Sequence, residues 1–267
     1  MKKLSAILLA AVISSMGITA QAQDNQMANH LALGVTLGLD GVGVQAALPL
    51  GPIVQLRAGY SIFPYSYSGK LDFGKVEMGG KERDLSQTPL NVSLWKGGNG
   101  KILADIFPGR KTNFHFTVGA FIGAGKLIHA RADISKAINP SEYATMAITY
   151  GEGADKISVS TDKNGFLFAD IKTRTGVVTP YLGIGFGRAV TPDNRVRVSF
   201  DLGTLITGGL RVQSYSYLRN EKGDPSVITS KNLVDEEGHS MDDGWLDKVC
   251  RIPVYPVMTL NVFVRLF

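Results

Sequence analysis

The chain has 267 residues, of which 28 are basic and 23 acidic, and its formal net charge is +5. So small an excess of positive charge, without a dense lysine and arginine block, gives no reason to expect nucleic acid as a partner. Cys250 is the single cysteine, so an internal disulfide is excluded.

The first 22 residues have the layout of a secretory signal peptide. Lys2 and Lys3 give a positive start, residues 4–18 are mostly apolar, and small residues close the segment. This apolar run is shorter than the about 20 residues of a membrane-spanning helix, which disfavours the alternative of a membrane anchor. We therefore expect cleavage after Ala22 and one domain over residues 23–267, with no transmembrane helix in it.

From residue 31 onward the dominant hydrophobic period is two, which predicts β-strands. In one run, Phe114 and Phe116 alternate with His115 and Thr117. Such runs are about ten residues long, whereas strands of soluble proteins have about 5–6 residues and a tilted strand crossing a bilayer needs about 9–11. The lengths favour membrane-crossing strands, which we expect at residues 31–39, 42–48, 53–63, 101–107, 114–126, 177–188, 195–207 and 254–267.

The connections between these strands alternate in length. Short turns are expected at 49–52, 108–113 and 189–194, and long loops at 64–100, 127–176 and 208–253. The first hairpin is the exception, because Asp40-Gly41 makes a two-residue turn on the side of the long loops. Short turns on one side and long loops on the other are typical of transmembrane barrels. The predicted fold class is all-β, a closed antiparallel transmembrane β-barrel of about eight strands.

Two alternatives to this fold stay open. A soluble β-sandwich also alternates, but its apolar face points inward, whereas a barrel in lipid has an apolar outside and a polar lumen. The count of eight can also rise to 10–12, because residues 67–76, 90–96, 165–173 and 210–218 can form strands, either in the barrel or in hairpins above the membrane. A short helix is expected to start at Asn139-Pro140 and to end at Gly151.

Charged side chains lie on the faces of strands that the barrel turns inward. Facing lipid at the bilayer midplane, an arginine costs about 2–4 kcal/mol, which places such residues in the lumen. We expect Arg57, Asp105, Arg197 and Asp201 to form a charge network that closes the lumen. The alternative is that each of them is separately hydrated in a wet interior.

Aromatic residues gather near the ends of the expected strands. They are expected to form girdles at the two membrane interfaces. A carbohydrate-binding platform made by the loop tyrosines is the alternative. The expected girdles contain Phe63, Tyr65, Tyr215, Tyr217 and Tyr255 at one end, and Phe107, Phe114 and Phe116 at the other.

Three stretches carry a resemblance to a known family. Residues 255–267 form an apolar strand that ends on a terminal aromatic, Phe267. Residues 179–203 contain a strand pair around a Pro-Asp-Asn turn, and residues 103–108 read Leu-Ala-Asp-Ile-Phe-Pro. The chain resembles the small, about eight-stranded outer-membrane β-barrels of Gram-negative bacteria, with an OmpA/OmpW-like barrel domain. The resemblance implies an outer-membrane location and makes Phe267 the expected assembly signal.

One position departs from this family's pattern. The family commonly has a second aromatic two residues before the end, where this chain has Arg265. The more apolar face of the last strand also lies opposite Phe267, which leaves open which face meets lipid. That apolar face contains Met258, Leu260, Val262, Val264 and Leu266.

Other chemistry finds little support in the sequence. The four histidines are far apart without metal-ligand spacing, and we expect no metal and no cofactor. Some barrels of this kind modify lipid A or cleave peptides near the outer rim, so an enzyme is the less favoured alternative. Its candidate residues are His129, Asp133, Ser135, Ser214 and His239.

The expected function follows from the barrel and its long loops. We expect a non-enzymatic, monomeric outer-membrane protein that is envelope-structural or binds an extracellular ligand through its loops. Its other expected partners are outer-membrane lipid, lipopolysaccharide and the barrel-assembly machinery. A narrow pore for small solutes is the runner-up, although eight strands enclose an interior that side chains can fill.

Overall fold

The computed structural model describes residues 30–72, 74–78, 81–150, 157–218, 223–229, 231, 248 and 250–266. Residues 1–29 and Phe267 lie outside this set, so cleavage after Ala22 and the assembly role of Phe267 stay predictions. Among the described residues no helix is long and apolar enough to cross a membrane.

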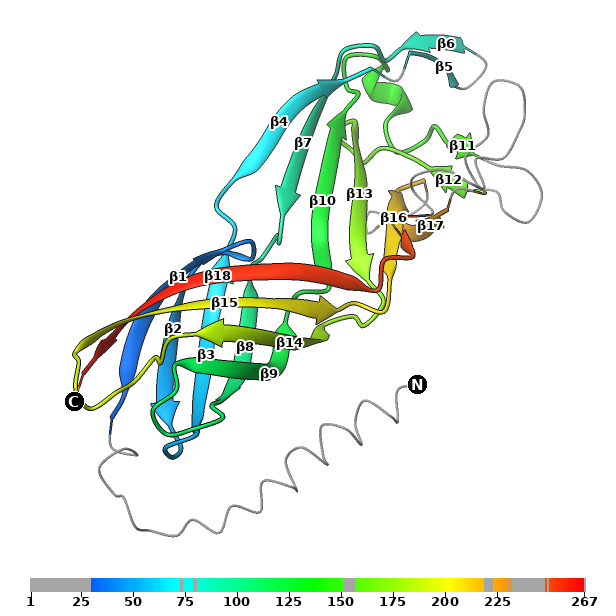
Figure 1. Ribbon diagram of the computed structural model, residues 1–267. Coiled ribbons are helices and arrows are strands. Elements are labelled where there is room, and N and C mark those ends of the chain that lie inside the picture. Colours follow the sequence, from blue (N-terminus) through cyan, green and yellow to red (C-terminus); the bar gives the residue numbers. More distant parts are fainter. Residues whose placement is uncertain are drawn as a thin grey trace.

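Eight antiparallel strands close into a barrel, which confirms the predicted fold (Figure 1). Each neighbours the next around the wall, and Val35 of the first strand pairs with Val262 of the last to close it. The closure rules out the sandwich alternative and the larger barrels. The strands, in order around the wall, are β1 (Ala32–Gly38), β2 (Gly41–Pro49), β3 (Val54–Ile62), β8 (Asn99–Ile106), β9 (Phe114–Ile122), β14 (Val178–Phe186), β15 (Val196–Ile206) and β18 (Val254–Arg265).

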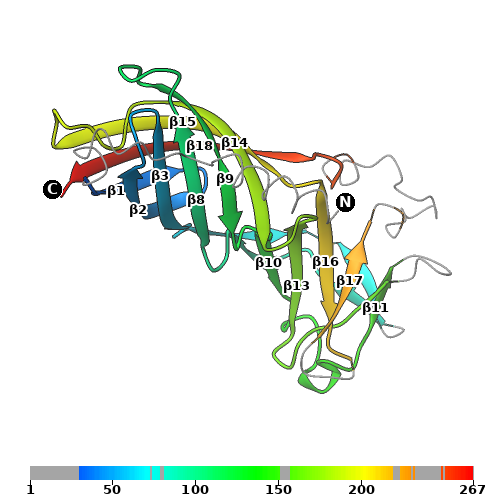
Figure 2. The same ribbon diagram turned by 90° about the horizontal axis from the view of Figure 1, so that it is seen from below.

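The long connections build a second sheet beyond one end of the barrel (Figures 1 and 2). All four segments that left the strand count open contribute to it, and none enters the barrel wall. The six strands, in order across this sheet, are β17 (Asp224–Ile228), β16 (Leu210–Ser216), β13 (Phe166–Thr173), β10 (Lys126–Asp133), β7 (Thr88–Leu94) and β4 (Ser66–Leu71). Two short hairpins complete the described strands: β5 (Lys75–Met78) with β6 (Lys81–Asp84), and β11 (Ile148–Tyr150) with β12 (Ile157–Val159).

Two expected elements differ from the structure. The strand expected at 114–126 ends at Ile122, because Gly123 takes a φ of 89° and the chain restarts as β10 at Lys126. The expected helix is a single 3₁₀ turn, Pro140–Glu142, since Tyr143 is already extended and Ala144 takes a φ of 55°. Its expected end, Gly151, lies outside the described residues.

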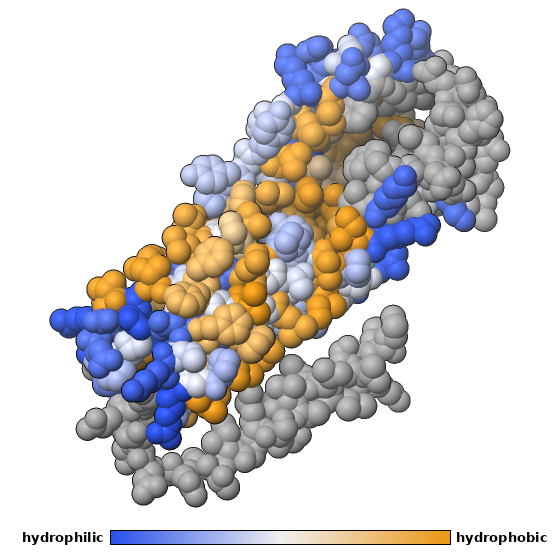
Figure 3. Space-filling view, viewed as in Figure 1, coloured by the Kyte–Doolittle hydropathy of each residue, from blue (hydrophilic) through white to orange (hydrophobic). Residues whose placement is uncertain are grey.

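The barrel wall is apolar outside and polar inside. Val35 and Val44 on its outer surface are 59% and 62% exposed, whereas Thr36 and Gln45 beside them in sequence are buried in the lumen. Apolar side chains cover the wall in Figure 3, with hydrophilic ones gathered at both ends. On β18, Met258 points outward and Thr259 inward, so the more apolar face of the last strand is the outer one. This polarity is that of a barrel in lipid.

Candidate functional site

The lumen holds a layer of charged side chains centred on Arg57 of β3. Its Nη2 lies 2.7 Å from Asp105 Oδ1 on β8, and its Nη1 lies 2.8 Å from Asp201 Oδ2 on β15. The three side chains are at most 3% exposed. One guanidinium therefore joins two carboxylates from strands on different parts of the wall, which is a geometry that suits the planar donors of arginine.

Neutral side chains complete the layer. His115 Nε2 lies 2.8 Å from Asp201 Oδ1, and Asn261 donates to Asp201 Oδ2 at 2.7 Å. Thr117 donates to Asp105 at 2.9 Å. The ligand atoms of Asp105, His115 and Asp201 lie within 4.8 Å of one another, as at a metal site. The guanidinium of Arg57 already supplies the positive charge between these carboxylates, so the donor set does not favour a cation.

Two residues of this layer were not predicted as part of it. Lys101 Nζ lies 2.8 Å from Asp40 Oδ2, and both side chains are buried in the lumen. Lys101 shares a strand face with Leu103 and Asp105, so the alternation that pointed to Asp105 also pointed to Lys101. Gly185 is the second kind of omission, because a Cβ there would lie 2.3 Å from His115 Nε2. Only glycine leaves room for the His115 ring at this place.

Arg197 lies outside the charge layer. It sits near the end of β15 where the short turns lie, and its guanidinium donates to the side-chain amide of Asn194 at 3.1 Å. No described ion pair joins it to Asp105 or Asp201. The alternation placed Arg197 on the inner face correctly, but its position along the strand puts it a turn away from the other three.

An apolar layer closes the lumen at the end that carries the long loops. Trp95, between β7 and β8, is 2% exposed and takes a φ of 48°. Its backbone N–H donates to the carbonyl of Leu127, and its ring meets Tyr255 edge to face. The other members of this cluster are Leu103, Phe121, Ala124, Leu127, Tyr181, Leu205 and Val257. Side chains from the wall and the sheet thus fill the lumen above the charges.

The opposite end is closed by the turn between β14 and β15. The Arg188 guanidinium donates to the carbonyls of Thr112, Pro52 and Gly109 at 2.9–3.0 Å, and it lies 3.9 Å from the Phe107 ring centroid. One side chain thereby ties all three short turns together. Gln55 also bonds this turn, donating to the carbonyl of Val190 at 2.7 Å and accepting from the N–H of Ala189 at 3.1 Å. Burial, and then Arg197, lower the pKa of Arg188.

A second charged cluster lies on the six-stranded sheet. Asp170 of β13 is fully buried, and it bonds His129 of β10 at 2.7 Å and Tyr215 of β16 at 2.5 Å. Lys126 Nζ lies 3.1 Å and Lys172 Nζ 3.6 Å from the same carboxylate. Burial alone would raise the pKa of Asp170, but the bonds from Tyr215, His129 and Lys126 lower it to about 2. Asp170 links three strands of the sheet.

The residues predicted for an enzyme do not assemble around His129. Ser135 donates to Asp133 at 2.6 Å, and Ser214 donates to the carbonyl of Phe168 at 3.1 Å. Each serine is thus engaged elsewhere, and the imidazole of His129 bonds Asp170 instead. His239 lies outside the described residues.

The predicted aromatic girdles are only partly present. Phe114 and Phe116 are exposed on the outer wall near the short turns, and Tyr65 is exposed at the other end. Phe107 is wrong as a girdle residue, because it is buried in the lumen under Arg188. Tyr255 is half-buried against Trp95. Tyr215 and Tyr217 belong to the six-stranded sheet and its edge.

Comparisons with known proteins add little to this geometry. No protein-family model matches the chain, and no curated protein matches it. Among solved structures, CarO2 of Acinetobacter baumannii is 14% identical with a TM-score of 0.46, over 88% of this chain and 98% of that one. CarO of the same organism is 16% identical with a TM-score of 0.42, over 87% and 96%. A major outer membrane protein from Thermus thermophilus is 12% identical with a TM-score of 0.31, over 88% and 98%.

Likenesses this distant carry no conclusion about activity or ligand. The class of the fold rests on the chain's own geometry instead. The closed barrel of eight antiparallel strands, apolar outside and polar inside, confirms the resemblance to small outer-membrane β-barrels at the level of fold.

Proposed function

We propose that this chain is an outer-membrane protein whose sealed barrel anchors the six-stranded sheet at the cell surface. Its role is non-enzymatic, either structural in the envelope or the binding of a surface ligand through the sheet and its loops. The apolar outer wall supports the membrane placement, because such a surface needs lipid around it. Long connections lie on the outer side in barrels of this kind, which supports placing the sheet outside the cell.

One observation carries the proposal: the described residues fill the lumen at three levels. Arg188 and Val190 close the end with the short turns, Arg57 and its carboxylates fill the middle, and Trp95 covers the other end. An eight-stranded barrel has an interior about wide enough for side chains to fill. A filled lumen favours the sheet, rather than a channel, as the working part.

Single-channel conductance tests this proposal. Protein purified from membranes in a neutral detergent, with its folding checked by a heat-dependent gel shift, is added to a planar lipid bilayer. We expect insertion without discrete conductance steps, because each of the three layers separately blocks the path. Reproducible steps from folded protein would contradict the sealed lumen and support the narrow pore instead.

A further inference from the structure

The two faces of the six-stranded sheet continue the two surfaces of the barrel. Leu94, Ile128 and Leu210 pack on the lumen-side cluster around Trp95, so this face of the sheet continues the inside. Side chains alternate along a strand, so Ser93, His129 and Arg211 belong to the opposite face. That face continues the outer wall, since a single hollow is lined by Tyr60 and Ile62 of the wall and by Ser66 and Ser93 of the sheet.

A row of cations crosses this outward face just above the apolar wall. Lys126 pairs with Lys172, and Lys172 pairs with Arg211, so the three lie directly opposite one another on adjacent strands. The outward-facing Ile122 precedes Lys126 by four positions along the chain. At about 3.3 Å per residue the cations start at most about 13 Å above the last apolar side chain of that strand. We call Lys126, Lys172 and Arg211 the rim row.

The rim row has more positive charge than its own surroundings neutralise. Like charges directly opposite each other destabilise a sheet. Among the described residues, Asp170 is the acid that bonds this row, and its fully buried carboxylate is shared with His129 and Tyr215. Lys126 nevertheless keeps 46% of its side chain exposed and Lys172 keeps 24%. Three cations held against one carboxylate leave a positive surface that an anion would complete.

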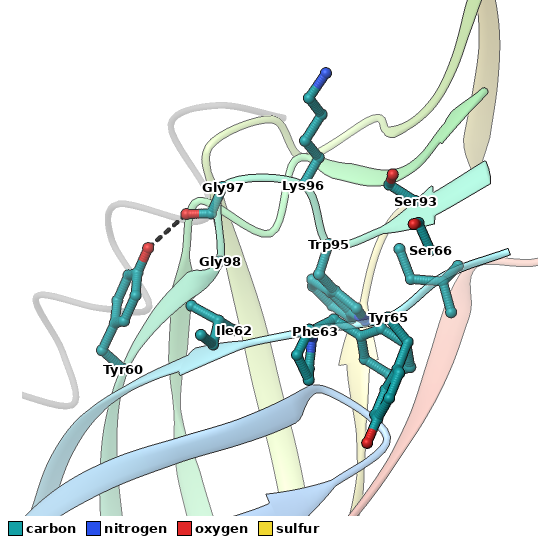
Figure 4. Close-up of a pocket in the computed structure, with 12 residues that line it drawn as sticks. Tyr60, Ile62, Phe63, Tyr65, Ser66, Ser93, Trp95, Lys96, Gly97 and Gly98 are labelled. Atoms are coloured by element: carbon teal, nitrogen blue, oxygen red, sulfur yellow. Dashed lines mark hydrogen bonds between the residues drawn. The ribbon is translucent and has the colours of Figure 1, made fainter. Parts of the chain in front are cut away.

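The hollow beside the rim row has the matching amphipathic lining. Its volume is about 480 Å³, and Figure 4 shows Phe63, Trp95 and Tyr65 gathered on one side of it. Tyr60 donates to the carbonyl of Gly97 at 2.5 Å across the hollow, and the exposed Lys96 stands at its edge. Aromatic rings with polar tips, flanked by a lysine, are typical of the interface between lipid chains and headgroups.

We infer that the rim row binds the phosphate-bearing headgroup of a lipid in the outer leaflet. This inference rests on the proposed placement of the sheet outside the cell. The occupant is a lipid because the row lies on the face that continues the apolar wall and directly above it. The headgroup is anionic because lysine and arginine pair with phosphate oxygens through charge-assisted hydrogen bonds. The acyl chains would then lie along the apolar wall below.

Native mass spectrometry of the full-length protein purified from membranes tests the inference. The protein is titrated in a neutral detergent with bis-phosphorylated lipid A, and in parallel with the same lipid after removal of its phosphates. We expect retention of the phosphorylated lipid only. In the variant K126Q/K172Q/R211Q its occupancy should fall by about tenfold or more. The matched control K75Q/K136Q/K163Q removes three exposed lysines far from the rim and should bind as the original protein does.

The remaining arms keep the outcome decisive. K126Q/R211Q retains the bond from Lys172 to Tyr215 and should still lose most of the bound lipid, which excludes a folding defect as the cause. Inorganic phosphate should not displace the lipid; displacement would identify a free-anion site and overturn the inference. Equal binding by the rim variant and its control would also overturn it. Conductance of the same samples separates this failure from failure of the sealed barrel.

Discussion

Arg57 is the residue on which the middle of the lumen depends. Its guanidinium is buried and lies between Asp105 and Asp201, which have no water to solvate them if it is removed. Removing one partner of a buried ion pair costs far more than the pair itself contributes, because the remaining charge stays buried and uncompensated. The arginine thus fixes two carboxylates that the barrel could not otherwise hold.

Arg57→Ala should therefore lower the free energy of unfolding in lipid vesicles by about 3–5 kcal/mol. Arg197→Ala is the matched control, because Arg197 lies on the same kind of strand face but outside the charge layer, and its loss should cost about 0.5 kcal/mol or less. Urea unfolding of both refolded variants measures the difference. Equal losses in the two variants would contradict the central role of Arg57.

At the same scale, sequence alternation located most of the lumen charges. It placed Arg57, Asp105 and Asp201 on inner faces, and the structure brings these three together. It could not separate Arg197 from them, because alternation reports the face of a strand and not the height of a residue in the barrel. That height depends on the tilt and register of neighbouring strands, which are properties of the closed sheet.

At the scale of elements, the six-stranded sheet is held across its strands by Asp170. The carboxylate bonds His129 on β10 and Tyr215 on β16 from its own place on β13. These bonds lower the pKa of Asp170 from 3.8 to about 2, against the opposing effect of burial. Because the folded pKa is depressed, the carboxylate stabilises the sheet above about pH 4, and this contribution is lost as the pH falls toward 2.

Asp170→Asn should reduce the stability of the sheet at pH 6 by about 1–2 kcal/mol, with partial solvent screening taken into account. The difference from the original protein should shrink between pH 4 and pH 2, where the original protein also loses its charge. Hydrogen exchange of the β10, β13 and β16 segments measures it. Asp193→Asn, in an exposed turn, should leave these segments unchanged, and a gap that is independent of pH would contradict the role of Asp170.

The strands of this sheet were predicted less completely than those of the barrel. Segments 67–76, 90–96, 165–173 and 210–218 were expected as strands of open location, whereas β10 and β17 were not expected at all. The run from Phe114 continues its alternation past Gly123, so the sequence offers no sign that one strand ends and a second begins there. The break is a change of direction in space, made where the barrel wall meets the sheet.

At the scale of the whole molecule, the position of the membrane follows from which side of the wall is apolar. Val44 lies near the middle of β2, is 62% exposed and neighbours Val35 and Tyr60 on the outer surface. In water an arginine at an exposed position changes stability little. In lipid near the midplane it has no polar partner, and it costs about 2–4 kcal/mol.

Val44→Arg should therefore lower the free energy of unfolding in lipid vesicles by about 2–4 kcal/mol. Val227→Arg, at a 45% exposed position on β17 of the sheet, is the matched control and should change it by about 0.5 kcal/mol or less. Urea unfolding with tryptophan fluorescence measures both. A tolerated Val44→Arg would place the outer wall in water and contradict the membrane assignment.

The sequence by itself determined the barrel: its eight strands, the alternation of short turns and long loops, and the polarity of inside and outside. Strand period and length are local properties, and both are strongly constrained when one face must meet lipid and the other a narrow lumen. Only the tertiary structure decided that the lumen is filled, because Trp95, Arg188 and Arg57 come from distant parts of the chain. It also decided that the long loops form one sheet whose outward face carries the rim row, since pairing between distant strands leaves no period in the sequence.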